Sequence, residues 1–71
     1  LYFAREGHLY VQRAGEGARR VTQGSAWHRD PHVRGDTLYY AADSAGHHDL
    51  FAVTVDGDGQ PVGARRRLTT H

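Results

Sequence analysis

The feature that most constrains this chain is a set of short motifs that each occur twice. The three pairs are Leu-Tyr-Phe-Ala at residues 1–4 and Leu-Tyr-Tyr-Ala at 38–41, Leu-Tyr at 9–10 and Leu-Phe at 50–51, and Arg-Val-Thr at 20–22 and Arg-Leu-Thr at 67–69. The offset between copies increases along the chain, and it increases only across segments rich in turn-forming residues. Insertions confined to connections produce this behaviour. We therefore predict an internal repeat with a period near 40 residues.

Each copy of the repeat has the character of short β-strands joined by turns. No window of eleven or more residues shows an apolar i, i+3, i+4, i+7 stripe free of Gly and Pro, so helices are not expected. Strands are predicted at 1–4, 8–12 and 18–22 in the first copy and at 38–42, 50–55 and 66–69 in the second. A loop is predicted at 43–48, and a turn at 56–59 that Pro61 and Gly63 extend. Pro31 keeps the stretch around Asp30 extended.

A period near 40 residues with three or four short strands per unit is typical of β-propeller blades. Along residues 50–55, alternate side chains share a face, and both faces are mostly apolar. Sheets stacked around an axis cover both faces, whereas an isolated sheet exposes one of them to water. The prediction is an all-β fold of antiparallel four-stranded blades, about one and three-quarter blades of a larger ring. Residues 1–24 would hold the last three strands of one blade and residues 25–71 the following blade; the alternative is a free-standing β-sandwich or barrel.

Composition limits what the chain can be. Leu, Val and Phe together supply 13 of 71 residues and Ile is absent. Because nine basic residues balance eight acidic ones, disorder is not favoured, but we expect the chain to rely on neighbouring sequence for part of its stability. It begins inside an apolar run without Met, so we expect a segment of a larger protein. No apolar run is long enough to span a bilayer. The lack of Cys is compatible with periplasm and cytoplasm alike, and localisation stays open.

Two parts of the second copy resemble a known repeat. Residues 43–51 resemble the hairpin of TolB-type propeller blades, in which an Asp, a Gly and a second Asp precede an aliphatic-aromatic strand. Residues 56–59 and 66–69 resemble the turn and the closing Arg-Leu-Thr of the same repeat, and residues 19–22 resemble a second copy of that closing motif. The resemblance covers most of the chain and implies the propeller fold. It implies little about activity, because propellers host many unrelated functions.

Two other segments are more similar to the propellers of tricorn-type peptidases. Arg29-Asp30-Pro31 resembles the start of an innermost strand, but the usual Ser-Pro-Asp-Gly turn is replaced by Val-Arg-Gly-Asp at residues 33–36. Tricorn-type blades often carry such a Gly-Asp before an aromatic strand. They also carry a compact hairpin similar to the Glu-Gly-His-Leu-Tyr of residues 6–10.

Three clusters could hold a metal ion, and none is assigned as a site. His28, Asp30 and His32 would share one side of a regular strand, but Pro31 interrupts it and further ligands are missing. His47, His48 and Asp49 are interpreted as a solvated hairpin tip, because adjacent residues of a strand point to opposite faces. Asp56-Gly57-Asp58-Gly59 lacks the third oxygen ligand and the distal Glu of a calcium loop, so it is interpreted as a turn. Asp43 and Asp49 are expected to accept backbone N–H bonds within the hairpin.

No catalytic, cofactor-binding or metal-binding residue is predicted. Ser25 and Ser44 are the only serines, and neither lies in a Gly-x-Ser-x-Gly elbow. Arg65, Arg66 and Arg67 form the one basic cluster, but a formal net charge of +1 is small for a nucleic-acid surface. These arginines are instead expected on an outer strand, where charge discourages edge-to-edge aggregation.

The resemblance implies a non-catalytic propeller segment of a larger hydrolase, a tricorn-like or prolyl-oligopeptidase-like serine peptidase, that gates or docks peptide substrates. The alternative is a TolB-like protein-binding propeller of the cell envelope with no catalytic domain. A third reading is a fragment whose copies join to complete a ring. The expected partners are neighbouring blades, a peptidase domain of the same chain, and a peptide or protein ligand. Nucleic acid, a membrane span and cofactors are not expected.

Overall fold

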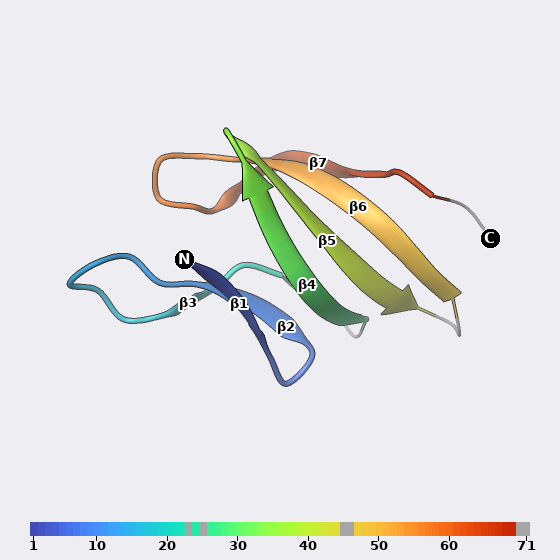
Figure 1. Cartoon of the computed structure of the whole chain (residues 1–71), viewed down its shortest axis with the longest axis horizontal. Coiled ribbons are helices and arrows are strands. Elements are labelled where there is room, and N and C mark those ends of the chain that lie inside the picture. The colour runs from blue at the N-terminus through green and yellow to red at the C-terminus, as the bar shows by residue number, and fades with distance from the viewer. Residues whose placement is uncertain (23, 25, 45–46, 70–71) are drawn as a thin grey trace.

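Seven β-strands and no helix make up the described residues, 1–22, 24, 26–44 and 47–69, of the computed structural model (Figure 1). The strands are β1 (Tyr2–Arg5), β2 (His8–Val11), β3 (Arg19–Arg20), β4 (Trp27–Arg34), β5 (Thr37–Ser44), β6 (His47–Val55) and β7 (Pro61–Arg67). They form one three-stranded sheet in the order β1-β2-β3 and one four-stranded sheet in the order β4-β5-β6-β7. All neighbouring strands are antiparallel. The predicted all-β class with antiparallel sheets is confirmed.

Three strands of the second sheet, β5, β6 and β7, are longer than predicted. Backbone pairing between β5 and β6 continues through Ser44 opposite His47, so most of the predicted loop at 43–48 is strand, and residues 45–46 lie outside the described residues. β7 begins at Pro61 rather than near residue 66. Proline is tolerated there because it is the first residue of an edge strand, where its missing N–H costs no ladder bond.

β4 is a complete edge strand with one irregularity. Arg29 pairs with Ala41 and His32 pairs with Tyr39, so two residues of β4 lie opposite the single residue between Ala41 and Tyr39. This is a β-bulge, and its first residue, Asp30, has a φ of 55°. Asp tolerates this left-handed conformation better than most residues. The predicted turn at 33–36 is shorter than expected, because residues 33 and 34 still pair within the ladder.

The two sheets bury one apolar core between them. Its buried residues are Leu9, Val11, Val21, Leu38, Tyr40, Ala42, Phe51, Val53 and Val55, with Tyr2 packed against them. The two faces of β6, which the sequence predicts to be mostly apolar, lie in different environments. Phe51, Val53 and Val55 are buried against the first sheet, whereas Leu50, on the other face, is 49% exposed.

The three strands of the first sheet match the last three of the second in pairing and hydrogen bonding. Phe3 lies opposite Tyr10 and Tyr40 opposite Phe51, and these aromatic pairs stack with ring centroids 5.7 and 5.8 Å apart. The same hydrogen bonds also recur between the middle strand of each set and the segment that follows its last strand, β3 or β7. The Leu9 N–H donates to Thr22 Oγ1 at 3.0 Å and the Leu50 N–H to Thr69 Oγ1 at 2.9 Å; the Val21 N–H donates to the Leu9 carbonyl at 2.8 Å and the Leu68 N–H to the Leu50 carbonyl at 2.7 Å.

One end of the interface between the sheets is held at the turn between β6 and β7. The Tyr2 hydroxyl donates to the Gly59 carbonyl at 2.7 Å, and burial together with the nearby Asp56 carboxylate raises the pKa of Tyr2, so the phenol stays protonated as a donor. Arg13, in the connection after β2, pairs with Asp58 at 2.6 Å. Both contacts join the first sheet to the second.

Candidate functional site

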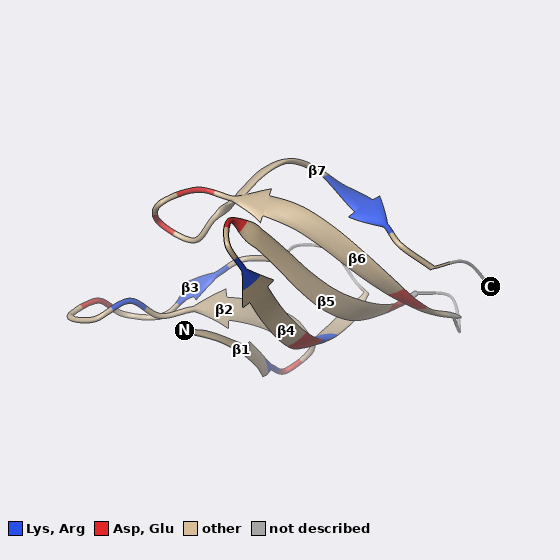
Figure 2. Ribbon diagram, turned by 45° about the horizontal axis from the view of Figure 1, so that its top comes forward, with Lys and Arg blue, Asp and Glu red and all other residues tan. Residues whose placement is uncertain are grey.

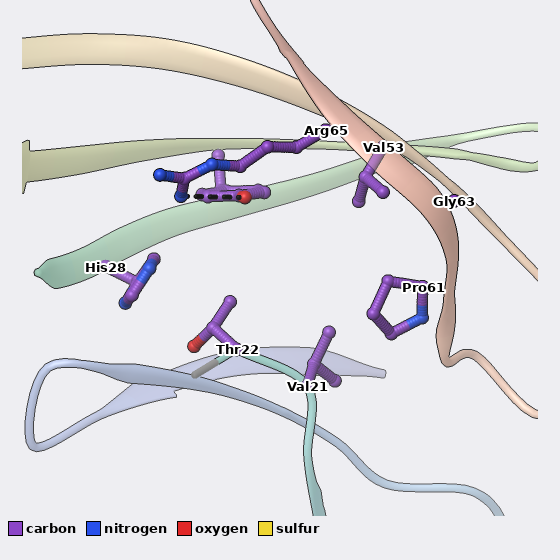
Figure 3. Close-up of a pocket in the computed structure, with 8 residues that line it drawn as sticks. Val21, Thr22, His28, Val53, Pro61, Gly63 and Arg65 are labelled. Carbon is purple, nitrogen blue, oxygen red and sulfur yellow. Dashed lines mark hydrogen bonds between the residues drawn. The ribbon is translucent and has the colours of Figure 1, made fainter. Parts of the chain in front are cut away.

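The candidate site is a cleft of about 240 Å³ between the two sheets (Figure 3). Val21 and Thr22, which follow β3, line one side of the cleft. All four strands of the second sheet contribute the other side, with three residues, Pro61, Gly63 and Arg65, from β7. Figure 3 shows two regions: His28, Thr22 and the Arg65 guanidinium gather at one end, and apolar side chains lie at the other.

Arg65 lies on the face of β7 that lines the cleft, next to a bulge. Arg66 pairs with Ala52 and Val62 with Thr54, so three residues of β7 lie opposite the single residue between Ala52 and Thr54. Gly63 sits in this bulge with a φ of 76°, a conformation that favours glycine. Because the bulge adds two residues, it preserves the alternation of faces: Arg66 lies opposite Ala52, and Arg65, next to it, lies on the face of Phe51 and Val53.

Two aromatic rings hold the Arg65 guanidinium. Its Cζ lies 4.1 Å from the centroid of the Phe51 ring, which is cation–π geometry. Its Nη1 donates to the Tyr40 hydroxyl at 3.4 Å. These contacts fix one face and one nitrogen of the guanidinium and leave its remaining N–H groups available.

His28 is the most deeply buried polar residue of the site. It is 1% exposed, and its ring stacks on that of His8 and is tilted against that of Tyr40, with centroids 5.6 and 5.7 Å away. The His28 backbone N–H donates to the Gly7 carbonyl at 2.8 Å, and its ring Nδ1 lies 3.1 Å from the same oxygen. Because a carbonyl oxygen only accepts, Nδ1 must carry the proton. This bond fixes the position and the tautomer of the ring.

The environment keeps this imidazole neutral. Burial lowers the pKa of His28 below its ordinary value of 6.5, and the positive charges of His8, Arg65 and Arg20 lower it further. The hydrogen bond to Gly7 opposes the shift but is the smaller effect. With the proton on Nδ1, Nε2 is a hydrogen-bond acceptor. The site thus combines a permanent cation with a neutral acceptor.

The three residues considered as metal ligands on β4 do not share a face. His28 pairs with Ala42 and His32 with Tyr39, positions of opposite parity on β5, because the bulge at Asp30 reverses the alternation. His28 is buried in the cleft while His32 is exposed on the far side. Within residues 1–22, 24, 26–44 and 47–69, no group of three or more metal-ligating side chains comes together.

The hairpin between β5 and β6 carries a polar cluster on the open face of the second sheet. His48 Nδ1 lies 2.6 Å from Asp43 Oδ1, and Arg29 Nη2 lies 3.7 Å from the same oxygen. Asp49 is buried, accepts a bond from Thr69 Oγ1 at 3.3 Å and lies 3.8 Å from Arg67. The contacts described for Asp43 are therefore with side chains, not with the backbone N–H groups expected from the sequence. Nothing is described for the His47 side chain.

The interpretation of residues 56–59 as a turn is confirmed. Asp56 Oδ1 accepts the backbone N–H groups of Asp58 at 2.9 Å and Gln60 at 3.0 Å, and the Gly59 N–H donates to the Asp56 carbonyl at 3.0 Å. This side chain closes the connection from β6 to β7.

The remaining sequence candidates separate in space. Ser25 and the side chain of Ser44 lie outside what the structure describes. Arg65, Arg66 and Arg67 all lie on β7, an edge strand, as expected, but only Arg65 lines the cleft. Figure 2 shows basic residues on β3, at the end of β4 and on β7, with acidic residues mainly in or beside the connections.

Sequence reasoning missed the cleft, because its two polar groups come from opposite edge strands. Gly63 was a signal for the bulge in β7 only, because an isolated glycine in a strand indicates a bulge.

No helix among the described residues is long and apolar enough to cross a membrane. In the comparisons with known proteins, no family model, curated protein or solved structure matched the chain.

Proposed function

We propose that the chain forms two consecutive blades of a β-propeller, within a larger hydrolase of the tricorn-like or prolyl-oligopeptidase-like peptidase type, and that it docks or gates peptides without catalysing their cleavage. The observation that carries the fold part of this proposal is the way in which the two sheets stack. They pack with unlike faces, and both outer faces retain apolar side chains.

The matched strands define which faces are alike. Phe3 and Tyr10 lie opposite each other in the first sheet as Tyr40 and Phe51 do in the second. Tyr40 and Phe51 are in the shared core, whereas the first sheet contributes Leu9 and its neighbours, from the face opposite to Phe3 and Tyr10. The same stacking applied again would place a preceding sheet on Phe3 and Tyr10.

The other outer face supports a following sheet. Leu50 corresponds to Leu9 and Leu68 to Val21. In the first sheet both positions are buried by the second, at 0% and 5% exposure, whereas the corresponding residues of the second sheet are 49% and 47% exposed. Their exposure is what a missing neighbour of the same kind would produce.

A second hollow of about 360 Å³ lies on this open face and also supports a following sheet. Its lining includes Ala41, Leu50 and Thr69, which correspond to Ala4, Leu9 and Thr22 of the first sheet. Around those residues of the first sheet, the interface is completed by the start of β4, whose backbone bonds to Gly7. We infer that the corresponding strand of a third sheet completes the second hollow.

Repeated stacking of unlike faces is a heterologous arrangement, and such arrangements close into rings when the rotation per unit permits. A ring of sheets has connections and inter-sheet clefts at its rims, and these surfaces can hold extended peptides. The peptidase assignment rests on the Gly35-Asp36 turn and the compact hairpin at residues 6–10, which resemble tricorn-type blades.

Thiol labelling tests the ring, because the chain contains no Cys. In the full-length protein we expect Leu50→Cys to react slowly with a water-soluble maleimide, like Leu9→Cys, and Asp58→Cys to react fast. Rapid labelling of Leu50→Cys in folded protein would refute the following sheet.

Peptidase assays test the hydrolase assignment separately. A gated peptidase should cleave short unstructured peptides and spare folded proteins. A full-length protein that completes its ring yet cleaves no peptide would contradict the assignment and favour the TolB-like protein-binding alternative.

A further inference from the structure

We propose that the cleft between the two sheets binds one carboxylate group on a small ligand with an apolar body, about the size of a single amino-acid residue. This goes beyond the proposed function, because the two sheets form the cleft on their own and the site requires neither a closed ring nor a hydrolase domain. Two sources fit the chemistry: the C-terminal residue of a peptide, and a free short carboxylic acid.

In the part of the chain that the structure describes, Arg65 is a cation without a carboxylate partner. Among the described residues, Arg13, Arg19, Arg29 and Arg67 each lie within 4.0 Å of a carboxylate. Of the other arginines, only Arg65 lines the cleft. No Asp or Glu lines the cleft. The two guanidinium charges that act on His28 there, those of Arg65 and Arg20, are both positive. The cleft is therefore electropositive and attracts an anion.

The geometry of Arg65 selects the kind of anion. Its guanidinium Cζ lies over the Phe51 ring, and only one nitrogen donates to Tyr40. The remaining N–H groups lie in one plane, where they form the fork that a carboxylate accepts through two parallel bonds. Since His28 is neutral, one guanidinium balances one negative charge, which suits a monocarboxylate better than a doubly charged phosphate.

His28 adds an acceptor. The Gly7 carbonyl holds Nδ1–H, and among the described groups no donor is bonded to Nε2. In the C-terminal residue of a peptide, an amide N–H stands next to the carboxylate, so such a ligand would offer Arg65 its anion and His28 its N–H. A free carboxylic acid would use Arg65 alone. This difference separates the two sources.

The volume of the cleft and its apolar walls limit the side chain that the ligand can carry. Val21, Val53 and Pro61 form the apolar end of the cleft, opposite the polar end (Figure 3). A volume of about 240 Å³ is below the range for drug-sized ligands and holds one small residue. We infer a short apolar side chain, as in alanine or valine.

The test measures binding of N-acetyl-L-alanine to the full-length protein by isothermal titration calorimetry or by chemical-shift perturbation. The arms are N-acetyl-L-alanine amide, which lacks the carboxylate; propionate, which lacks the amide; a tetrapeptide ending in alanine; and inorganic phosphate. We expect the acetylated amino acid to bind at least about tenfold more tightly than its amide. Tighter binding of the acetylated amino acid and the tetrapeptide than of propionate identifies the peptide source, and equal binding of propionate identifies the free acid.

The variants localise the site. Arg65→Gln is expected to weaken binding at least about tenfold, and Arg65→Lys, which keeps the charge but loses the fork, to weaken it by less. Arg66→Gln is the matched control, because the neighbouring arginine lies opposite Ala52 in the regular ladder and does not line the cleft; its binding should stay within about twofold.

Four outcomes would overturn the proposal: no binding of any carboxylate by the folded protein, equal binding of the amide, tighter binding of phosphate, or equal losses in Arg65→Gln and Arg66→Gln. If Arg65→Gln does not fold, Arg65→Lys and the comparison of acid with amide on the unchanged protein decide the matter.

Discussion

The Trp27 ring lies directly on Gly7. A Cβ added at Gly7 would come within 2.6 Å of Trp27 Cε3, a separation that real Cβ atoms do not show. Gly7 also has a φ of 82°, and its carbonyl accepts both the backbone N–H and the ring N–H of His28. One residue without a side chain thus joins the first hairpin to the start of β4.

Gly7→Ala should therefore cost more than a substitution that only strains the backbone. Gly15 is the matched control: its φ is 78°, and nothing lies within 4 Å of its added Cβ. We expect Gly15→Ala to lower the free energy of unfolding by about 1–2 kcal/mol, and Gly7→Ala to lower it by about 1–3 kcal/mol more because of the clash with Trp27. Urea unfolding followed by the fluorescence of Trp27, the single Trp, measures both. Equal losses would show that the contact with Trp27 is unimportant.

Thr22 and Thr69 accept corresponding backbone hydrogen bonds, but only the bond to Thr22 is buried, so we expect their substitutions to differ in cost. Thr22→Val keeps the shape but leaves the buried Leu9 N–H without its partner, which should lower the free energy of unfolding by about 1–3 kcal/mol. Thr69→Val removes the corresponding bond to Leu50, where water can replace the acceptor in the two-sheet structure. Its cost should be below about 1 kcal/mol unless a further sheet covers Leu50. Similar large losses in the full-length protein would thus support such a sheet, whereas a negligible loss for Thr22→Val would contradict the hydrogen bond.

The lowered pKa of His28 predicts how stability depends on pH. Below about pH 6.5, the unfolded chain takes up a proton at this position that the folded protein does not bind. The free energy of unfolding should therefore fall as the pH drops below 6.5, by up to about 1.4 kcal/mol per pH unit, until the pH passes through the folded-state pKa. Above pH 6.5 this contribution is constant.

Denaturant unfolding at pH 7.5 and 5.0 measures the effect. His28→Gln should reduce the decrease in stability on acidification, and His32→Gln, at an exposed position on the same strand, should preserve it. A decrease that is the same in all three proteins would exclude His28 as its cause.

The ion pair between Arg13 and Asp58 should contribute little. The Arg13 and Asp58 side chains are 46% and 65% exposed, so water and salt screen the attraction even though the two groups come from different sheets. A double-mutant cycle with Arg13→Gln and Asp58→Asn is expected to give a coupling energy of about 0.2–1 kcal/mol that decreases with added salt. A coupling energy above about 2 kcal/mol would mean that the pair is buried in the full-length protein.

The central strands of the second sheet were predictable because their apolar content and spacing are strong local signals. The predicted strands at 38–42 and 50–55 lie inside β5 and β6, and the hairpin predicted from residues 1–4 and 8–12 corresponds to β1 and β2. The strand ends were not predictable: His and Asp side chains near the hairpin favour a loop locally, but the ladder continues to Ser44 and His47 because backbone groups there still find partners.

The candidate site depended on one irregularity and one pairing that local signals do not resolve. The bulge at Asp30 sends His28 and His32 to opposite faces, and a residue count with regular alternation gives the opposite answer. The bulge around Gly63 preserves the alternation, and Arg65 faces the core side because its neighbour Arg66 pairs with Ala52. Both depend on how the strands and sheets meet, which is a property of tertiary packing.

Stacking unlike faces gives the molecule a direction. Suppose that two copies associate as the two sheets already do, with the second sheet of one copy in the place that would cover the next. This contact buries one apolar face of each copy and leaves the other apolar face of each copy exposed, one at each end of the pair. A shortened version of such an array would therefore have no dimer at which to stop: it would lengthen into filaments, unless its curvature brings the two ends together.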